Sequence, residues 1–166
     1  WGYKMRVWAQ EQKSNGPSRL IGSGDLATAA TAALANGTAA HGYELDDTHE
    51  ASSSHPGAVV ITAALAVAAE CGSNGRDILA AVAAGYEAMT RIGRAAISQQ
   101  VTERGFHATC LFGPFGAATA AAKLMGLDAE GLARSWGLAL SMVGGSSQFA
   151  HEPQGTMVKR MHAGIP

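Results

Sequence analysis

Residues 57–70, GAVVITAALAVAAE, constrain the fold more than any other stretch of the chain. Their apolar side chains fall on every side of a helix, and a helix without a polar face is normally buried on all sides. His55 and Pro56 directly precede the run. Proline is favoured at the first helical position because the N–H it lacks has no partner there. The sequence therefore predicts a central helix that starts at Pro56 and holds His55 rigidly at its beginning.

Other helical patterns surround this one, and strand patterns are nearly absent. They cover residues 23–40, 77–97, 113–124 and 128–142. The expected N-terminal caps are Ser23 or Asp25, Asp77, the GPFG segment that starts at Gly113, and Asp128. Inward positions include Ile97 at the end of the second pattern and Leu140 in the last one.

We predict an all-α fold, a helical bundle. Residues 1–22 form a poorly defined N-terminal segment, and residues 23–166 form one helical domain.

Composition and charge exclude several classes of protein. The net charge is −1 and the basic residues are scattered, so no nucleic-acid surface is predicted. No apolar run reaches the roughly 18 residues that a membrane span needs, and no signal-peptide pattern opens the chain. Cys71 and Cys110 lack metal-site spacing, so we expect reduced thiols in a cytoplasmic protein. Because the chain opens on Trp1 instead of Met, we expect further residues upstream.

Titratable side chains are concentrated between two helical patterns, in residues 41–61. This stretch holds four of the 13 acidic residues and three of the 6 histidines: Glu44, Asp46, Asp47, Glu50, His41, His49 and His55. Such a group is typical of an active-site loop or of a structural metal loop. Asp46 and His49 share a helical face, but no HExxH motif or cysteine pair accompanies them, so we predict no metal. Alternatively, one of the adjacent aspartates Asp46 and Asp47 caps a helix while the other faces a pocket.

Two histidines lie just before predicted helices. The positive end of a helix disfavours imidazolium, so His55 is expected to be a neutral imidazole that can act as a base. A packing histidine bonded to a carbonyl is an equal alternative. His107 precedes the helix expected at Gly113–Gly116, whose free N–H groups would accommodate a carboxylate; an exposed loop histidine is the alternative.

Lys159 and Arg160, close to His162 in the sequence, are candidates to bind the same anion. A solvated basic pair is the alternative interpretation, since isolated lysines are mostly exposed.

Five segments occur in an order that resembles the MmgE/PrpD family, which includes 2-methylcitrate dehydratase, cis-aconitate decarboxylase and related epimerases. They are ALANGTAAHGYELDDTHEASSSHPGAVV, GRDILAAVAAGYEAMTRIGRA, GFHATCLFGPFGAA, LMGLDAEGLARSWGLALS and GTMVKRMHAG. The resemblance covers about residues 33–164. It implies an all-helical first domain, whereas the family's second, smaller α/β domain has no counterpart here, so we expect a chain truncated at its C-terminus.

The resemblance also implies site residues. Implied catalytic residues are Asp47, His55, His107 and Lys159. Implied substrate-binding residues are Glu44, Asp46, Thr48, Gly116, Arg160 and His162. Glu44 departs from the family, because many members carry the first aspartate of a DFDDT motif at this position.

The implied activity is that of a dehydratase-like lyase acting on a small di- or tricarboxylate, with no cofactor and no metal, as a homodimer. Proton abstraction next to a carboxylate would be assisted by fixed positive groups. The loop before His55 and Pro56 is one residue longer than in decarboxylase members, which favours dehydration. The alternatives are an epimerase or decarboxylase of the same family, a catalytically inactive helical module that dimerises and, third, a metal-bound hydrolase.

Overall fold

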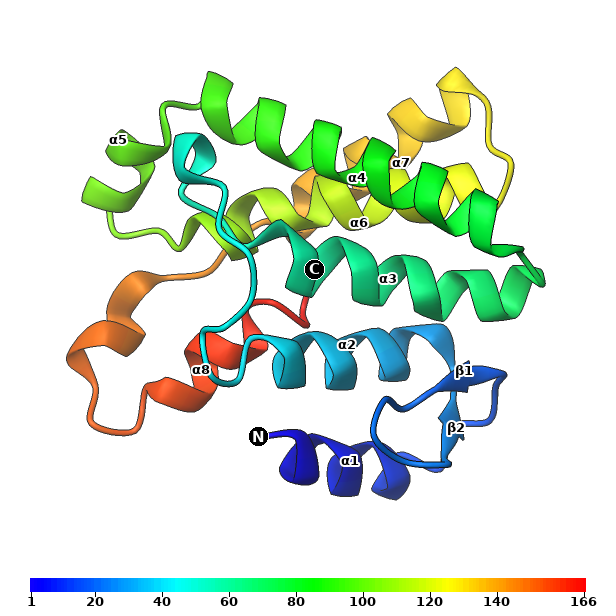
Figure 1. Cartoon of the computed structure of the whole chain (residues 1–166). Helices are drawn as coiled ribbons and strands as arrows, with labels where there is room; N and C mark the ends of the chain where they lie inside the picture. Colours follow the sequence, from blue (N-terminus) through cyan, green and yellow to red (C-terminus); the bar gives the residue numbers. More distant parts are fainter.

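The computed structural model describes residues 1–166 and consists almost entirely of helices (Figure 1). The longer helices are α1 (Gly2–Glu11), α2 (Ala29–Ala40), α3 (Pro56–Cys71), α4 (Gly75–Ala95), α6 (Ala108–Leu124) and α7 (Ala129–Met142). The shorter ones are η1 (Glu50–Ser52), α5 (Ser98–Glu103), η2 (Ser147–His151) and α8 (Thr156–Met161). Strands β1 (Ser18–Arg19) and β2 (Leu26–Ala27) form one small antiparallel sheet. The predicted all-α fold is confirmed.

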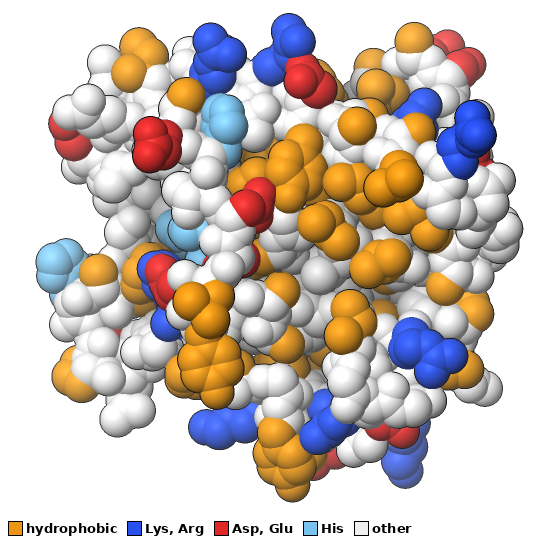
Figure 2. All heavy atoms as spheres, viewed as in Figure 1, with side chains coloured by type: hydrophobic (Ala, Val, Ile, Leu, Met, Phe, Trp, Pro, Cys, Tyr) orange, Lys and Arg blue, Asp and Glu red, His pale blue; other side chains and the backbone are white.

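Helix α3 is the central helix, as the sequence predicts. It lies between α2 on one side and α4 and α6 on the other (Figure 1). Val59 and Val60 are almost completely buried, and Pro56 is the first helical residue. One stripe of α3 nevertheless reaches the surface, because Ile61 and Leu65 are each 40% exposed. Apolar side chains gather there on the face shown in Figure 2.

Helices α4 and α6 approach each other closely at glycines. A Cβ atom on Gly116 would lie 2.9 Å from the Cβ of Met89 and 2.9 Å from Cγ2 of Val60. Gly85 is on the facing side of α4, and its carbonyl oxygen lies close to Gly116. Small residues at this crossing allow α3, α4 and α6 to pack as one core.

Two predicted helix starts were wrong. Helix α2 begins at Ala29 and not near Ser23, because Leu26 and Ala27 pair as a strand with β1 and keep the backbone extended. Thr28 is the cap, and its side chain accepts from the N–H of Thr31. In α4 the cap is Asn74 in place of Asp77, since the Asn74 side chain accepts from the two backbone N–H groups that follow.

The start of α6 was also predicted wrongly. The helix begins at Ala108, directly after His107, and Pro114 lies inside it. Proline lacks the N–H that would bond to the preceding turn, so the GPFG segment resembled a helix start. Gly113 and Gly116 are buried positions in the helix interior, where small residues permit close packing.

Two residues expected to face inward are at the surface. Ile97 is 56% exposed because α4 ends at Ala95, two residues before it. Leu140 is 61% exposed, and its neighbour Ala139 faces the core instead.

The two ends of the chain pack against α2. Within residues 1–22, α1 buries Met5 and Ala9 in a small core shared with α2. At the other end, α8 contacts α2, and Ala163 joins the main core. None of the helices combines the length and apolar character that crossing a membrane requires.

Candidate active site

Residues 41–55 connect α2 to α3 in a loop that closes on itself. His41 follows the last residue of α2, and His55 precedes the first residue of α3. Between them, the backbone N–H of His49 donates to the carbonyl of Ser54 at 2.9 Å. The closure brings the imidazoles of His41 and His55 together, with ring centroids 4.6 Å apart.

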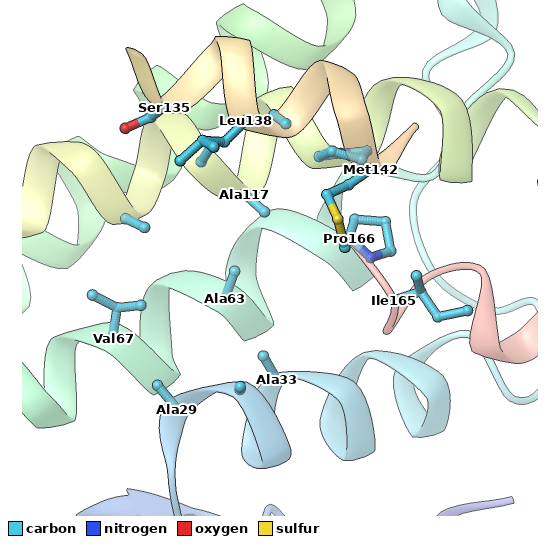
Figure 3. Close-up of a pocket in the computed structure, with 15 residues that line it drawn as sticks. Ala29, Ala33, Ala63, Val67, Ala117, Ser135, Leu138, Met142, Ile165 and Pro166 are labelled. Carbon is cyan, nitrogen blue, oxygen red and sulfur yellow. The ribbon is translucent and has the colours of Figure 1, made fainter. Parts of the chain in front are cut away.

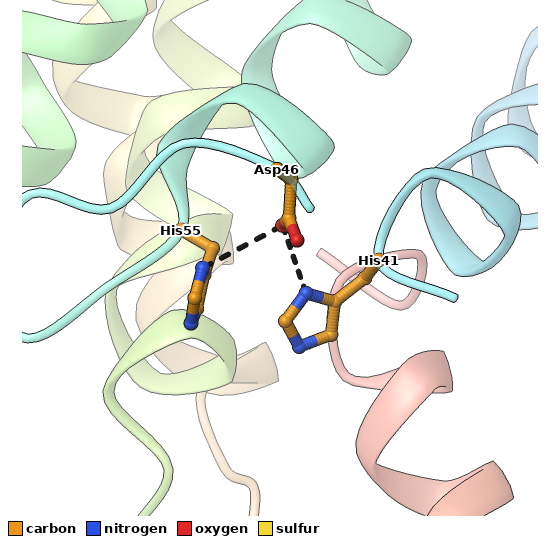
Figure 4. Close-up of side chains that lie close together, drawn as sticks. All are labelled: His41, Asp46 and His55. Carbon is orange, nitrogen blue, oxygen red and sulfur yellow. Dashed lines mark hydrogen bonds and ion pairs between the residues drawn. The ribbon is translucent and has the colours of Figure 1, made fainter. Parts of the chain in front are cut away.

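His41 and Asp46 form a buried pair at the base of this loop (Figure 4). Nδ1 of His41 lies 2.8 Å from Oδ2 of Asp46, and their side chains are 0% and 8% exposed. Burial acts to raise the pKa of Asp46, but the hydrogen bond and charge of His41, a backbone hydrogen bond and the charge of His55 lower it below its usual value. Nε2 of His41 and Oδ1 of Asp46 are buried without a partner. The pair therefore retains unused hydrogen-bonding capacity.

His55 is held by the loop at the start of α3. Its backbone N–H donates to Oγ1 of Thr109 at 3.1 Å, and Nδ1 of its ring lies 3.0 Å from the carbonyl oxygen of Asp47. A carbonyl oxygen only accepts hydrogen bonds, so this contact assigns the hydrogen to Nδ1 and leaves a lone pair on Nε2. Thr48 Oγ1 is a more distant neighbour of the same ring nitrogen, at 3.4 Å.

Asp47 points away from the imidazoles. Its Oδ1 accepts from the backbone N–H of Gly57 at 2.9 Å, and its Oδ2 accepts from the hydroxyl of Tyr86 at 2.9 Å. Burial, followed by the hydrogen bond to Asp47 and the charges of Asp47 and Asp46, raises the pKa of Tyr86 well above its usual value. One aspartate thus caps α3 while its neighbour Asp46 faces the cluster, which is the arrangement expected for an adjacent pair.

His107 and His162 form a second imidazole pair, contributed by the start of α6 and the end of α8. Their Nδ1 atoms are 3.1 Å apart, so one ring donates to the other. Burial, followed by the charges of His162, His41, Lys159 and His55, lowers the pKa of His107 to about 3. Burial and the charge of His41 also lower the pKa of His162. Phe149 packs edge-on against both rings.

Glu44 joins the loop to the cations of α8. Its carboxylate accepts from Nζ of Lys159 at 2.5–2.6 Å and from Nη1 of Arg160. Partial burial acts to raise the pKa of Glu44, but the hydrogen bond and charge of Lys159, with the charges of His41 and Arg160, lower it below its usual value. These three side chains and Phe149 line an open cavity of about 430 Å³.

The four imidazoles converge from four helix ends. His41 follows α2 and His162 follows α8, whereas His55 precedes α3 and His107 precedes α6. The ring centroids of His41 and His107 are 6.1 Å apart, which links the two pairs into one cluster.

Not every predicted site residue belongs to this cluster. The structure brings together Glu44, Asp46, His55, His107, Lys159, Arg160 and His162, with Thr48 at the edge. Asp47 faces Tyr86, and Gly116 lies in the α4–α6 crossing. The sequence prediction omitted His41 and Phe149 from the site. His41 belonged to the noted titratable stretch, but nothing in the sequence singled out Phe149.

Three groups of the loop lie close enough to bind a metal ion. Ligand atoms of His41, Asp46 and His55 are within 4.8 Å of one another. However, Nδ1 of His41 and Oδ2 of Asp46 are already joined by a hydrogen bond. A metal at these atoms would have to displace that hydrogen, so the donor set is poorly prepared for one.

A second cavity, of about 390 Å³, lies between α2, α3, α6 and α7 (Figure 3). Its lining side chains are apolar except for Ser135. Because it contains no titratable group, it offers no acid or base, and the imidazole cluster is the stronger candidate for chemistry.

The chain is similar to a known family and to several curated proteins. Residues 1–165 match the family described as the MmgE/PrpD N-terminal domain. Cis-aconitate decarboxylase from Aspergillus terreus is 32% identical over 99% of this chain and 34% of its own length. A cis-aconitate decarboxylase-like protein from Aspergillus oryzae is 31% identical over 97% of the chain and 34% of its own length. Human cis-aconitate decarboxylase is 32% identical over 91% of the chain and 31% of its own length. The chain thus spans about a third of the length of these curated relatives.

Proposed function

Because the chain belongs to the MmgE/PrpD family, we propose that its imidazole cluster is the active site of a lyase acting on a small di- or tricarboxylate. One observation carries the proposal: four imidazoles cluster at the ends of four helices, and Phe149 separates two of them from an open cavity lined by two cationic side chains. The relatives named for cis-aconitate, itself a tricarboxylate, support this substrate class.

The cations explain how the site would favour such a reaction. Removing a proton next to a carboxylate places additional negative charge on the carboxylate oxygens. Fixed positive groups at those oxygens stabilise the charge as it develops. Lys159 and Arg160 occupy this position at the cavity wall.

His55 is the proposed base. Because its Nδ1 hydrogen faces the carbonyl oxygen of Asp47, its Nε2 lone pair is free to accept a proton from the carbon next to the carboxylate. The hydrogen bond to Thr109 fixes the backbone at this residue, so the ring orientation is set before the substrate binds.

The His107–His162 pair is the proposed acid. In the neutral pair, the ring that accepts at Nδ1 carries its hydrogen on Nε2, and this N–H is the proposed proton donor. In a dehydration, His55 takes the carbon-bound proton, the electron pair forms the double bond, and the departing hydroxyl leaves as water with a proton from the pair; His55 then returns its proton to the pair. In a decarboxylation, carbon dioxide leaves, the pair protonates the carbon, and solvent restores the proton. The additional residue in the loop before His55 and Pro56 favours dehydration, whereas the names of the curated relatives favour decarboxylation.

The test is to incubate the chain with citrate, 2-methylcitrate or cis-aconitate in D2O and to follow the products by NMR. With citrate or 2-methylcitrate we expect loss of the proton next to a carboxylate, with release of water; cis-aconitate, which has no hydroxyl group, tests for release of carbon dioxide instead. Both His55→Asn and His107→Gln should lower the rate by about 100-fold or more. His151→Gln, at an exposed histidine outside the cluster, is the control.

If neither exchange nor binding occurs with any of these acids, the proposal is wrong. A folded, dimeric and unreactive chain would favour the non-catalytic helical module instead.

A further inference from the structure

The turn at residues 43–45 presents its side chains in an unusual way. Tyr43 and Leu45 are 80% and 89% exposed, whereas the carboxylate of Glu44 between them points to the cations of α8. Glu44 also has a left-handed backbone conformation, with φ at 55°. Non-glycine residues rarely adopt this conformation, and it often marks a functional position.

Two donors hold one oxygen of Glu44. Oε1 lies 2.5 Å from Nζ of Lys159 and bonds to Nη1 of Arg160. Nε2 of His41, 3.8 Å away, is buried without a hydrogen-bond partner and carries no hydrogen in the neutral ring, because the hydrogen on Nδ1 bonds to Asp46. An arrangement of two cations is suited to a carboxylate, because charged donors bind carboxylates most strongly.

From this geometry we infer that Glu44 occupies the binding position for a substrate carboxylate, and that a ligand must displace it to reach Lys159 and Arg160. The inference rests on the proposed function, because it specifies how the same site selects its substrate. Position 44 would then determine specificity, since its own carboxylate competes with one carboxylate of the ligand.

Residues 43–45 make few contacts besides the ion pairs of Glu44. Their backbone N–H groups donate to no backbone carbonyl. The side chains on both sides of Glu44 are exposed, so they contribute little packing. The Glu44 side chain is itself 34% exposed, so solvent reaches its carboxylate. The turn can therefore move while Asp46 and Asp47 hold the rest of the loop in place.

Charge explains why the competition matters. Lys159 and Arg160 supply two positive charges, while Glu44 and Asp46 supply two negative charges beside them. A tricarboxylate therefore meets a site without excess positive charge. When Glu44 leaves, one net positive charge becomes available to the ligand.

Glu44→Gln tests the inference, because it removes the charge and keeps the size of the side chain. The probe is tricarballylate, a tricarboxylate without a hydroxyl group to eliminate, and the measurement is its Kd by titration calorimetry. We expect the Kd to decrease by about tenfold relative to the original chain. Glu130→Gln is the matched control, since Glu130 is also a carboxylate paired with an arginine, Arg134, but lies outside this cavity; the Kd of this variant should change by less than twofold.

The combination Glu44→Gln with Lys159→Met should abolish the gain in affinity. A second measurement needs no substitution: on saturation with tricarballylate, the pKa of Glu44 followed by carboxyl NMR should return towards its ordinary value. An unchanged or weaker Kd in the folded Glu44→Gln variant overturns the inference. The inference is also overturned if the pKa of Glu44 is the same with and without tricarballylate.

The two proposals fail in different ways. Tighter tricarballylate binding by Glu44→Gln without any proton exchange on substrates would support the displacement and contradict the lyase. Proton exchange on substrates by the original chain, with no increase in tricarballylate affinity for Glu44→Gln, would support the lyase and contradict the displacement.

Discussion

His41 lies in the buried interior and belongs to the imidazole cluster. Its side chain is fully buried, one ring nitrogen bonds to Asp46, and the other faces Glu44. A histidine in this position has its tautomer set by the carboxylate, because an ionised carboxylate only accepts. His41 therefore orients the site in addition to filling space.

Replacing His41 should reveal how strongly the pair is coupled. His41→Ala leaves the Asp46 carboxylate buried without its donor, and we expect a loss of about 3–5 kcal/mol in the free energy of unfolding. In a double-mutant cycle with Asp46→Ala, the second change should cost much less, with a coupling of about 1–3 kcal/mol. Urea unfolding gives the free energy of unfolding of the original chain, the two single variants and the double variant. Simple additivity of the two single changes would contradict a direct interaction.

The depressed pKa of His107 predicts a pH dependence of stability. The unfolded chain protonates this residue near its ordinary value of 6.5, and the folded chain does so only near 3. Between these values the unfolded state binds more protons, so the free energy of unfolding falls as the pH falls, by at most about 1.4 kcal/mol per pH unit for one proton. His162, whose pKa is also lowered, acts in the same direction.

Thermal unfolding from pH 6.5 to 5.5 isolates the histidine contribution, because Glu44 and Asp46 in the unfolded chain bind protons mainly near their ordinary pKa values of 4.5 and 3.8, and in the folded chain at still lower pH. His107→Gln should flatten the pH dependence in this window, and the exposed control His151→Gln should leave it unchanged. An equal slope in His107→Gln would show that His107 is not the titrating group.

At the level of elements, the helix crossing of α4 and α6 determines where His107 lies. Gly116 belongs to this crossing and not to the site, although the family resemblance implied a binding role. Only a residue without a side chain fits between Met89 and Val60 at this distance. Its contribution to the site is therefore indirect.

A pair of glycine substitutions checks this interpretation. Gly116→Ala should lower the free energy of unfolding by about 1–3 kcal/mol, because the new methyl group overlaps Met89. Gly137→Ala in α7 meets open space and should raise it by about 0.5–1 kcal/mol through helix propensity. Chemical denaturation distinguishes the two. A stable Gly116→Ala variant with lost ligand binding would instead indicate a direct role in the site.

The role of Asp47 depends on how α3 and α4 pack. The sequence allowed two roles for the adjacent aspartates, and only the structure shows that Asp47 caps α3 and contacts Tyr86. Local sequence predicts that one of them is a cap, because short polar side chains satisfy free N–H groups. Which one depends on Tyr86, 39 residues away, and no local pattern contains that information.

For the whole molecule, ligand binding should act differently on two segments that are distant in the sequence. A carboxylate bound by Lys159 and Arg160 replaces the ion pairs that connect the loop after α2 with α8. We expect hydrogen exchange to slow in residues 156–162 when tricarballylate is added, because binding stabilises this helix against local opening. Exchange in residues 43–45 should not slow, because Glu44 loses its ion pairs; slower exchange there would contradict the displacement. Residues of α7 that line the apolar cavity are the internal control, and their exchange should not change.

The helical class and the central position of α3 were predictable, because the apolar run has no alternative to burial. The helix starts were less predictable. Near each of Thr28, Asn74 and Ala108, another residue matched the sequence pattern of a helix start more closely. The convergence of His107 with His162 depends on packing across 55 residues, so spacing alone does not contain it.

All four imidazoles stand at the tips of helices, and this has an evolutionary consequence. The helices form a rigid framework, and each of the four imidazoles is attached directly at a helix end. Inserting or deleting a residue in one connection would reorient a single imidazole without disturbing this framework. A fold of this type can diversify its reactions by editing loops while its core sequence stays under an unchanged packing constraint.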